Sequence, residues 1–189
     1  MSGPRYAELQ VTSHFSFLRG ASSCDELFAA AALLGIEALA VVDRNSLAGV
    51  VRAHEAAKAT GIRLIVGCRL DLADGMSLLV YPRDRAAYGR LCRLLSLGKS
   101  RGGKGLCHLE WADVVAYGEG LIAILLPDLA DDTCALQLRH LREAFGRDAY
   151  VALTLRRRPN DQLRIHELAN LATQMAVATV VTNDVLFHH

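Results

Sequence analysis

Residues 38–61 read ALAVVDRNSLAGVVRAHEAAKATG, and this stretch decides the fold class. Its first five residues, 38–42, are all apolar, which is typical of a strand buried on both faces of a parallel sheet. Residues 47–60 then favour a helix, and Gly61 is the kind of residue that commonly ends one. A strand followed directly by a helix is the repeating unit of parallel α/β proteins, so this stretch predicts one βα unit.

The same alternation continues along the chain in both directions. Ser23 and Glu26 have capping-box spacing ahead of an alanine-rich helix that ends at Gly35. Residues 73–75 signal a turn, and residues 98–105, GKSRGGKG, predict a flexible basic loop. Periodicity fits both an open doubly wound sheet and a closed barrel. The expected strands are 6–11, 38–42, 63–72, 76–81, 120–126, 150–155 and 176–181, and the expected helices are 24–34, 47–60, 84–97, 111–117, 132–145 and 159–174.

Composition is typical of an ordinary single-domain protein. The 189 residues are 52% hydrophobic and 22% charged, with a net charge of +1. A sizeable core is therefore expected, whereas a strong sequence-independent nucleic-acid clamp would need a basic excess. Five cysteines without a Cys-x-x-Cys pair favour a reduced cytosolic protein over a zinc ribbon. We read no secretory leader and no apolar run of about 18 residues, so we expect a cytoplasmic protein without a membrane span.

Five short segments at expected strand ends carry the functional signal. They are LQVTSHFSFLRG at 9–20, AVVDRNSLAG at 40–49, GCRLDL at 67–72, YVALTLRR at 150–157 and TNDVL at 182–186. Together they resemble the motifs of the PHP family (polymerase and histidinol phosphatase). The resemblance is closest to the N-terminal PHP domain of bacterial DNA polymerase III α-type polymerases, and within these to the error-prone paralogue. It implies an α/β fold, a single domain with mostly parallel strands in a distorted (βα)7-type PHP barrel.

Metal-holding members of this family carry His-x-His, an acid before glycine, and Asp-His in the first two motifs. The resemblance identifies the corresponding positions here as a vestigial metal site, in which aspartate remains at only two. These positions are Gln10, Thr12, Arg19, Asp43, Arg44, Arg69, Arg156, Asp184 and Leu186. A guanidinium has no lone pair to offer a metal and stays protonated. We therefore expect no catalytic metal and no catalytic residue at this site.

Two roles are open for the arginines. They can pair with Asp43, Asp184 and backbone carbonyls and so close the former cavity, because buried charges need partners. They can instead bind phosphate, a nucleotide or a DNA backbone, because guanidinium forks suit phosphate oxygens. The candidate anion-binding residues are Arg19, Arg44, Arg69 and Arg156. A residual metal site is a further alternative, built from His14, Asp43, Cys68, Asp184, His188 and His189.

The chain of 189 residues is too short for a polymerase palm, thumb and fingers, so residues 1–189 are expected to be the PHP domain of a larger polymerase. The resemblance implies a parent DNA polymerase that acts in damage-induced synthesis, with Mg²⁺ in its palm and no cofactor in this fragment. Its implied partners are the remainder of the polymerase chain, DNA through that remainder, the sliding clamp and damage-response accessory proteins, with no membrane. The fragment itself is expected to be an inactive scaffold. The alternatives are an active metal-dependent phosphoesterase or 3'-5' exonuclease domain, or an anion-binding module.

Overall fold

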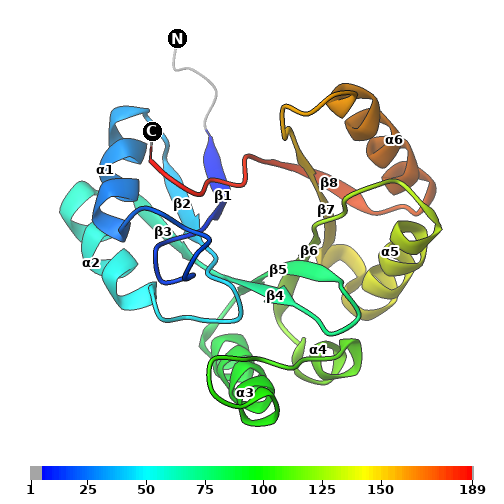
Figure 1. Ribbon diagram of the computed structural model, residues 1–189, viewed down its shortest axis with the longest axis horizontal. Helices are drawn as coiled ribbons and strands as arrows, with labels where there is room; N and C mark the ends of the chain where they lie inside the picture. Colours follow the sequence, from blue (N-terminus) through cyan, green and yellow to red (C-terminus); the bar gives the residue numbers. More distant parts are fainter. Residues whose placement is uncertain (1–5, 189) are drawn as a thin grey trace. The chain divides into compact units, whose positions relative to one another are not determined.

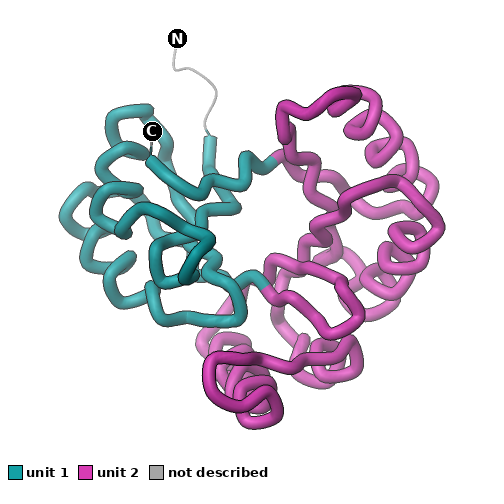
Figure 2. The backbone as a smooth tube through the Cα atoms, viewed as in Figure 1, with its two compact units in different colours: residues 1–69, 182–189 teal, residues 70–181 magenta. Residues whose placement is uncertain are grey.

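The computed structural model describes residues 6–188, which belong to two compact units (Figures 1 and 2). Unit 1 comprises residues 1–69 and 182–189, and unit 2 comprises residues 70–181. Strands and helices alternate through most of the chain, and three of the four strand pairs whose registers are defined are parallel. The fold is therefore α/β with mostly parallel strands, as the sequence predicts.

Unit 1 is built around a three-stranded parallel sheet. Its strands are β1 (Ala7–Val11), β2 (Ala38–Val41) and β3 (Arg63–Val66), in the order β1-β2-β3. Helices α1 (Cys24–Leu33) and α2 (Val50–Thr60) lie beside one another along this sheet (Figure 1). Apolar side chains from both helices and from the strands form one buried cluster, which includes Val11, Phe28, Leu39 and Ala53.

Unit 2 contributes most of a five-stranded sheet. In the order of the sheet, its strands are β4 (Cys68–Asp71), β5 (Ser77–Pro82), β6 (Leu121–Leu125), β7 (Ala149–Thr154) and β8 (Ala178–Thr182). Strands β5 and β6 are antiparallel, whereas β6 and β7 are parallel. None of the helices within residues 6–188 has the length and apolar character needed to cross a membrane. The helices of unit 2 are α3 (Arg85–Gly102), α4 (Trp111–Tyr117), α5 (Asp132–Phe145), the 3-10 helix η1 (Gly146–Asp148) and α6 (Asp161–Gln174).

The local signals in the sequence are confirmed at several helix ends. Ser23 Oγ accepts a hydrogen bond from the Glu26 backbone N–H, and the Glu26 carboxylate accepts one from the Ser23 N–H at 2.8 Å, which completes the predicted capping box. Gly61 ends α2 in the left-handed conformation, with φ of 77°. Helices α4 and α5 have the predicted boundaries. Capping and glycine signals depend only on neighbouring residues, which is why the sequence reveals them.

Residues 63–72 form two strands, and the prediction of one strand is wrong. Strand β3 ends at Val66 and pairs in the sheet of unit 1, whereas β4 begins at Cys68 and pairs with β5. Just after this break, Arg69 donates its backbone N–H to the Asp43 carbonyl at 3.1 Å. Continuous apolar character predicts burial but does not say which neighbour a strand pairs with.

Residues 98–102 are helical, and the prediction of a loop that begins at Gly98 is wrong. Helix α3 continues to Gly102, and the returning chain crosses it closely, with the His108 N–H donating to the Gly98 carbonyl at 2.9 Å. A Cβ on Gly98 would lie 2.6 Å from Cys107 Sγ and 2.7 Å from Leu109 Cγ. Glycine is therefore present for close packing here and does not interrupt the helix.

This packing predicts opposite effects for two Gly→Ala variants of the same helix. Gly98→Ala should lower the free energy of unfolding by about 1–3 kcal/mol, because the new methyl group collides with Cys107 and Leu109. Gly89→Ala is the matched control, since nothing lies within 4 Å of its Cβ position, and it should raise stability by about 0.5–1 kcal/mol. Urea denaturation of both variants checks this. Equal effects would show that residues 103–109 do not pack against α3 as described.

Candidate functional site

The end of β1 carries two of the predicted positions, Gln10 and Thr12. Both are buried, at 3% and 2% exposure, and they have the same strand parity. Gln10 Nε2 donates to Asp184 Oδ1 at 2.7 Å, and Gln10 Oε1 accepts from Thr182 Oγ1 at 2.7 Å. The Thr12 backbone N–H donates to the Val185 carbonyl at 2.9 Å. The Gln10 amide is thus held at both ends, and it ties β1 to residues 182–185.

Asp43 follows β2 and is 2% exposed. Its Oδ2 accepts from Ser13 Oγ at 2.8 Å, and its Oδ1 accepts from Ser16 Oγ at 2.7 Å and from the Ser13 backbone N–H at 3.0 Å. Ser16 Oγ in turn accepts the Arg44 backbone N–H at 2.9 Å. A Cβ on Gly49 would lie 2.5 Å from Asp43 Oδ2, so glycine makes room for the carboxylate before α2 begins. Asp43 therefore anchors the loop between β1 and α1.

Three of the predicted arginines belong to unit 1, and they have different surroundings. Arg44 and Arg69 are partly buried and face each other as partners in a parallel β-bridge, with the Asn45 N–H donating to the Arg69 carbonyl at 2.7 Å. Arg19 is exposed on the loop between β1 and α1. The side-chain hydrogen bonds to the carboxylates of Asp43 and Asp184 come from Ser13, Ser16 and Gln10, which are neutral groups.

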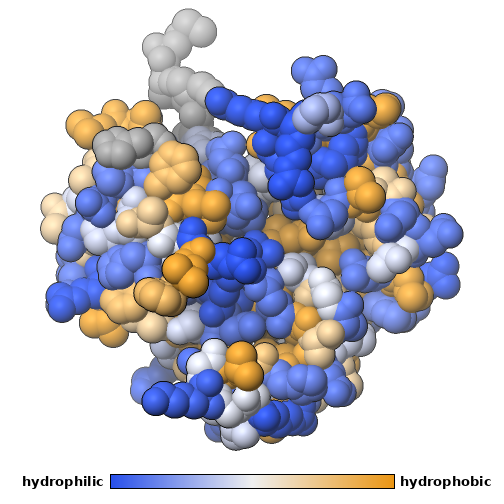
Figure 3. All heavy atoms as spheres, viewed as in Figure 1, coloured by the Kyte–Doolittle hydropathy of each residue, from blue (hydrophilic) through white to orange (hydrophobic). Residues whose placement is uncertain are grey.

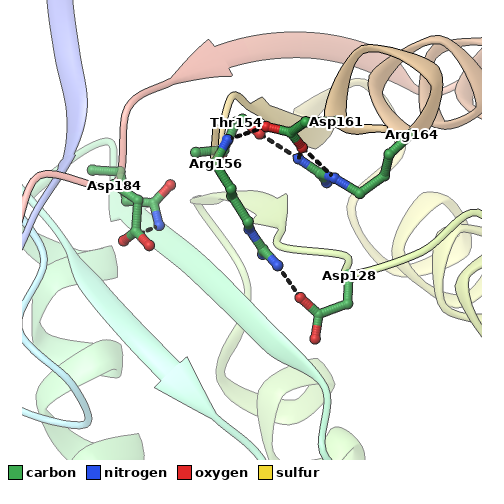
Figure 4. Close-up of polar contacts among 7 residues, drawn as sticks. Asp128, Thr154, Arg156, Asp161, Arg164 and Asp184 are labelled. Atoms are coloured by element: carbon green, nitrogen blue, oxygen red, sulfur yellow. Dashed lines mark hydrogen bonds and ion pairs between the residues drawn. The ribbon is translucent and has the colours of Figure 1, made fainter. Parts of the chain in front are cut away.

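Arg156 lies in unit 2, at the end of β7 (Figure 4). Its guanidinium pairs with Asp128 and holds the pKa of that carboxyl below its usual range. Asp161, at the start of α6, accepts the backbone N–H groups of Arg156 and Arg157 and a hydrogen bond from Arg164 Nε at 2.8 Å. Hydrophilic side chains gather over this segment between β7 and α6 on the face shown in Figure 3. Arg156 is thus part of a local network whose members Asp128, Asp161 and Arg164 all belong to unit 2.

Glu8 is a buried polar residue of β1 that contacts Gln10 and that the sequence motifs did not single out. It is 1% exposed and accepts hydrogen bonds from Tyr6 OH at 2.7 Å, from the Gln10 N–H at 2.8 Å and from Asn183 Nδ2 at 2.8 Å. Burial, together with the bonded Glu8 carboxylate, raises the pKa of Tyr6. Glu8 has the strand parity of Gln10 and Thr12, and this spacing was the signal that could have identified it.

The donors of the alternative metal site do not form a cluster of three. His14 Nδ1 lies 3.3 Å from the Ser22 carbonyl and His188 Nδ1 lies 2.7 Å from Ser22 Oγ, so two of the histidines lie beside the same residue. Cys68 Sγ donates to the carbonyls of Asp43 and other residues. Across residues 6–188, no three His, Cys, Asp or Glu side chains lie close enough together to hold a metal ion, and His189 lies outside the described residues.

The donor set at the family's ligand positions does not fit a transition metal. Gln10 already uses its amide oxygen as an acceptor for Thr182, and the remaining substituted positions offer hydroxyl, guanidinium or hydrocarbon. A guanidinium repels a divalent cation, and hydrocarbon gives it no ligand. Leu186 contributes only its backbone carbonyl, which accepts the Ala21 N–H at 2.8 Å. That this site holds no metal remains a prediction, which the donor chemistry supports.

A family model described as PHP domain matches residues 8–175. Error-prone DNA polymerase 1 of Agrobacterium fabrum is 72% identical over 188 residues, which cover 100% of this chain and 17% of that polymerase. An error-prone DNA polymerase of Caulobacter vibrioides is 46% identical over 190 residues, covering 100% and 18% respectively. A solved structure described as a metal-dependent phosphoesterase from Bifidobacterium adolescentis has a TM-score of 0.72 at 13% identity, covering 100% of this chain and 90% of that one.

The arrangement of strands and helices defines an α/β protein with the fold of that solved structure. The chain belongs to the PHP domain family. Its relatives at 72% and 46% identity are error-prone DNA polymerases, of whose length it spans less than a fifth.

The anchor at Asp43 predicts a pH dependence of stability. Burial raises the pKa of Asp43, although hydrogen bonds from Ser16 and Ser13 oppose the shift. The folded chain therefore holds this proton more tightly than the unfolded chain. The stability that results is fully present below the ordinary aspartate pKa of 3.8 and is lost as the pH rises through the higher folded value.

The measurement is urea denaturation of the wild type and of Asp43→Asn at a series of pH values upward from about 4. The free energy of unfolding of the wild type minus that of the variant should fall as the pH rises. Asp25→Asn removes an exposed carboxylate from the same unit and controls for the loss of one charge. A difference that rises with pH would mean that the carboxylate is stabilised in its ionised form.

Proposed function

We propose that this chain is the PHP domain of an error-prone DNA polymerase and serves it as a metal-free structural scaffold. The identity of 72% over the whole chain to a polymerase of this kind supports the assignment to such a parent. Template-directed nucleotide addition, Mg²⁺ and most DNA contacts then belong to the remainder of the polymerase, in the cytoplasm during damage-induced synthesis. The sliding clamp and damage-response accessory proteins are partners of that parent in the same proposal.

The scaffold role rests on one observation above all, which is how the Gln10 amide is used. It donates to Asp184 and accepts from Thr182, both at 2.7 Å, and so bridges β1 to residues 182–184 without a charge. An imidazole pair at Gln10 and Thr12 would place metal ligands here, whereas the amide supplies a fixed cross-link. The proposal includes the finer architecture of the family, a single domain closed as a distorted barrel of about seven βα units.

Metal analysis tests the scaffold role against an active phosphoesterase or 3'-5' exonuclease. After dialysis against Mn²⁺ or Zn²⁺, the wild type should hold no more metal than Asp184→Asn, because the matched positions lack usable donors. It should also release no phosphate from a phosphomonoester and no nucleotide from single-stranded DNA. Inductively coupled plasma mass spectrometry and product release measure the two quantities.

A variant with Gln10→His, Thr12→His, Arg19→Glu and Arg44→His restores the donor types of the first two family motifs. A gain of bound metal in this variant shows that the method detects such a site in this fold. The scaffold proposal fails if the wild type retains two or three ions and Asp184→Asn loses them together with a measurable turnover.

Anion binding is a second candidate function. The parallel β-bridge between the backbones of Arg44 and Arg69 supports it. The two residues are bridge partners on neighbouring chain segments, so their guanidinium stems start close together. Two guanidinium groups at one place suit a phosphate, since each fork can donate two parallel hydrogen bonds. Arg156 does not need to take part, because its guanidinium is paired with Asp128.

Phosphate should then stabilise the wild type, by about 2.7 kcal/mol when its concentration is a hundred times the dissociation constant. Arg44→Gln and Arg69→Gln should each reduce the rise in melting temperature on adding phosphate. Arg52→Gln is the control, because Arg52 is an exposed arginine of the same unit that pairs with Glu55. Differential scanning fluorimetry at constant ionic strength makes the measurement, and an identical rise in all four proteins removes this candidate.

A further inference from the structure

The loop between β1 and α1 exposes large apolar side chains that neither the scaffold nor the vestigial site explains. Phe17 is 84% exposed and Leu18 is 86% exposed, and Phe15, at 38%, lies on the same loop. Single apolar residues on a protein surface are normal, but neighbouring ones at the tip of a loop typically mark an interaction site. We call Phe15, Phe17 and Leu18 the apolar tip.

The backbone beneath the apolar tip is firmly held. The Ser16 N–H donates to the Ser13 carbonyl at 3.0 Å, and the Arg19 and Gly20 N–H groups donate to the Ser16 carbonyl at 2.9 and 3.1 Å. Asp43 holds both serine hydroxyls from the buried side. A loop that is already ordered loses little conformational entropy when it binds, so the apolar tip is suited to docking.

Leu18 also has an unfavourable backbone conformation. Its φ of 60° lies in the left-handed region, which is costly for a residue with a Cβ. Such conformations persist where the surrounding structure imposes them, and they are concentrated at binding and functional sites. Glycine would relieve the strain here, but it would remove the apolar side chain. The strain therefore points to a use for the leucine side chain outside this loop.

The last described residues lie beside the same loop. The Ala21 N–H donates to the Leu186 carbonyl at 2.8 Å, and the His188 N–H donates to Ser22 Oγ at 3.0 Å. Leu186 and Phe187 are 36% and 57% exposed and add apolar surface to this segment. On the face shown in Figure 3, apolar side chains are visible over the β1–α1 loop and over the C-terminal segment. Residues 186–188 therefore lie beside the loop that carries the apolar tip.

We propose that the apolar tip, together with Leu186 and Phe187, is the surface on which the remainder of the polymerase polypeptide docks. This inference rests on the proposed function, because it needs a chain that continues beyond residue 189. The chain spans 17% of its 72%-identical relative, so more than four fifths of that polymerase lies outside the match. A segment that is covalently joined nearby has a high effective concentration, so even a small apolar contact holds it. The exposed Arg19 beside Leu18 calls for an acidic group on the docking surface.

The test compares the 189-residue chain with the full-length protein from the native reading frame. Hydrogen exchange of residues 14–20 should be at least about tenfold slower in the full-length protein, because docking covers the loop. The double variant Phe17→Ser, Leu18→Gly removes the apolar tip while glycine accepts the left-handed φ. It should leave the melting temperature of the 189-residue chain unchanged or raised, and it should abolish the added protection in the full-length protein.

The control variant is Leu33→Ser, Leu34→Ser. These leucines are 90% and 74% exposed at the end of α1 in the same unit, so the variant removes similar apolar area from another place. It should leave the protection of residues 14–20 intact. Limited proteolysis just beyond residue 189 should be several-fold faster in the Phe17→Ser, Leu18→Gly protein than in this control.

The possible failures are distinguishable. A reading frame that ends near residue 189 overturns both the parent polymerase and the docking. A full-length protein that polymerises DNA but exchanges residues 14–20 as fast as the short chain keeps the proposed function and overturns the docking alone. Dimers of the 189-residue chain that dissociate in the double variant would assign the surface to a second copy. Protection that requires an added protein would assign it to a separate partner, and either outcome overturns the proposal.

Discussion

The structure of unit 1 depends on one buried carboxylate. Asp43 lies at the end of the strand that decides the fold class, and it accepts hydrogen bonds from two serine side chains of the loop after β1. A buried carboxylate without such donors would be strongly unfavourable, so the position of the loop and the charge of Asp43 depend on each other. Gly49 completes the arrangement, because any larger residue would collide with the carboxylate. Residues that match a family metal motif are thus explained here by the hydrogen bonds they make.

The same reasoning explains why the polar positions of β1 are compatible with a scaffold. Glu8 and Gln10 on β1 and Thr12 directly after it are all buried, so their polar groups need partners. The partners of Glu8 and Gln10 include Thr182, Asn183 and Asp184, which join the first strand to a segment more than 170 residues away. This junction is made by direct hydrogen bonds, so the ends of the unit remain tied without a metal.

How much the sequence could predict depended on whether the signal was local. The capping box at Ser23, the left-handed Gly61 and the boundaries of α4 and α5 follow from neighbouring residues and were predicted. The break near Gly67 and the role of Gly98 depend on contacts with distant segments, which no local pattern records. The site followed the same rule. The motifs located Asp43, Asp184 and Gln10. The hydrogen bond between Gln10 and Asp184, and those from Ser13 and Ser16 to Asp43, became visible only in the fold.

The arginines at the positions that resemble the family's ligand positions have a further physical consequence. Arginine cannot lose its charge to adapt to a buried position, so each guanidinium must reach solvent or a partner. The structure shows both solutions, since Arg19 is exposed while Arg156 pairs with Asp128. The two aspartates of the old motif are therefore available to fix the backbone. The exposed apolar tip is held in place by one of them, Asp43, through the hydrogen bonds that its carboxylate accepts from Ser13 and Ser16.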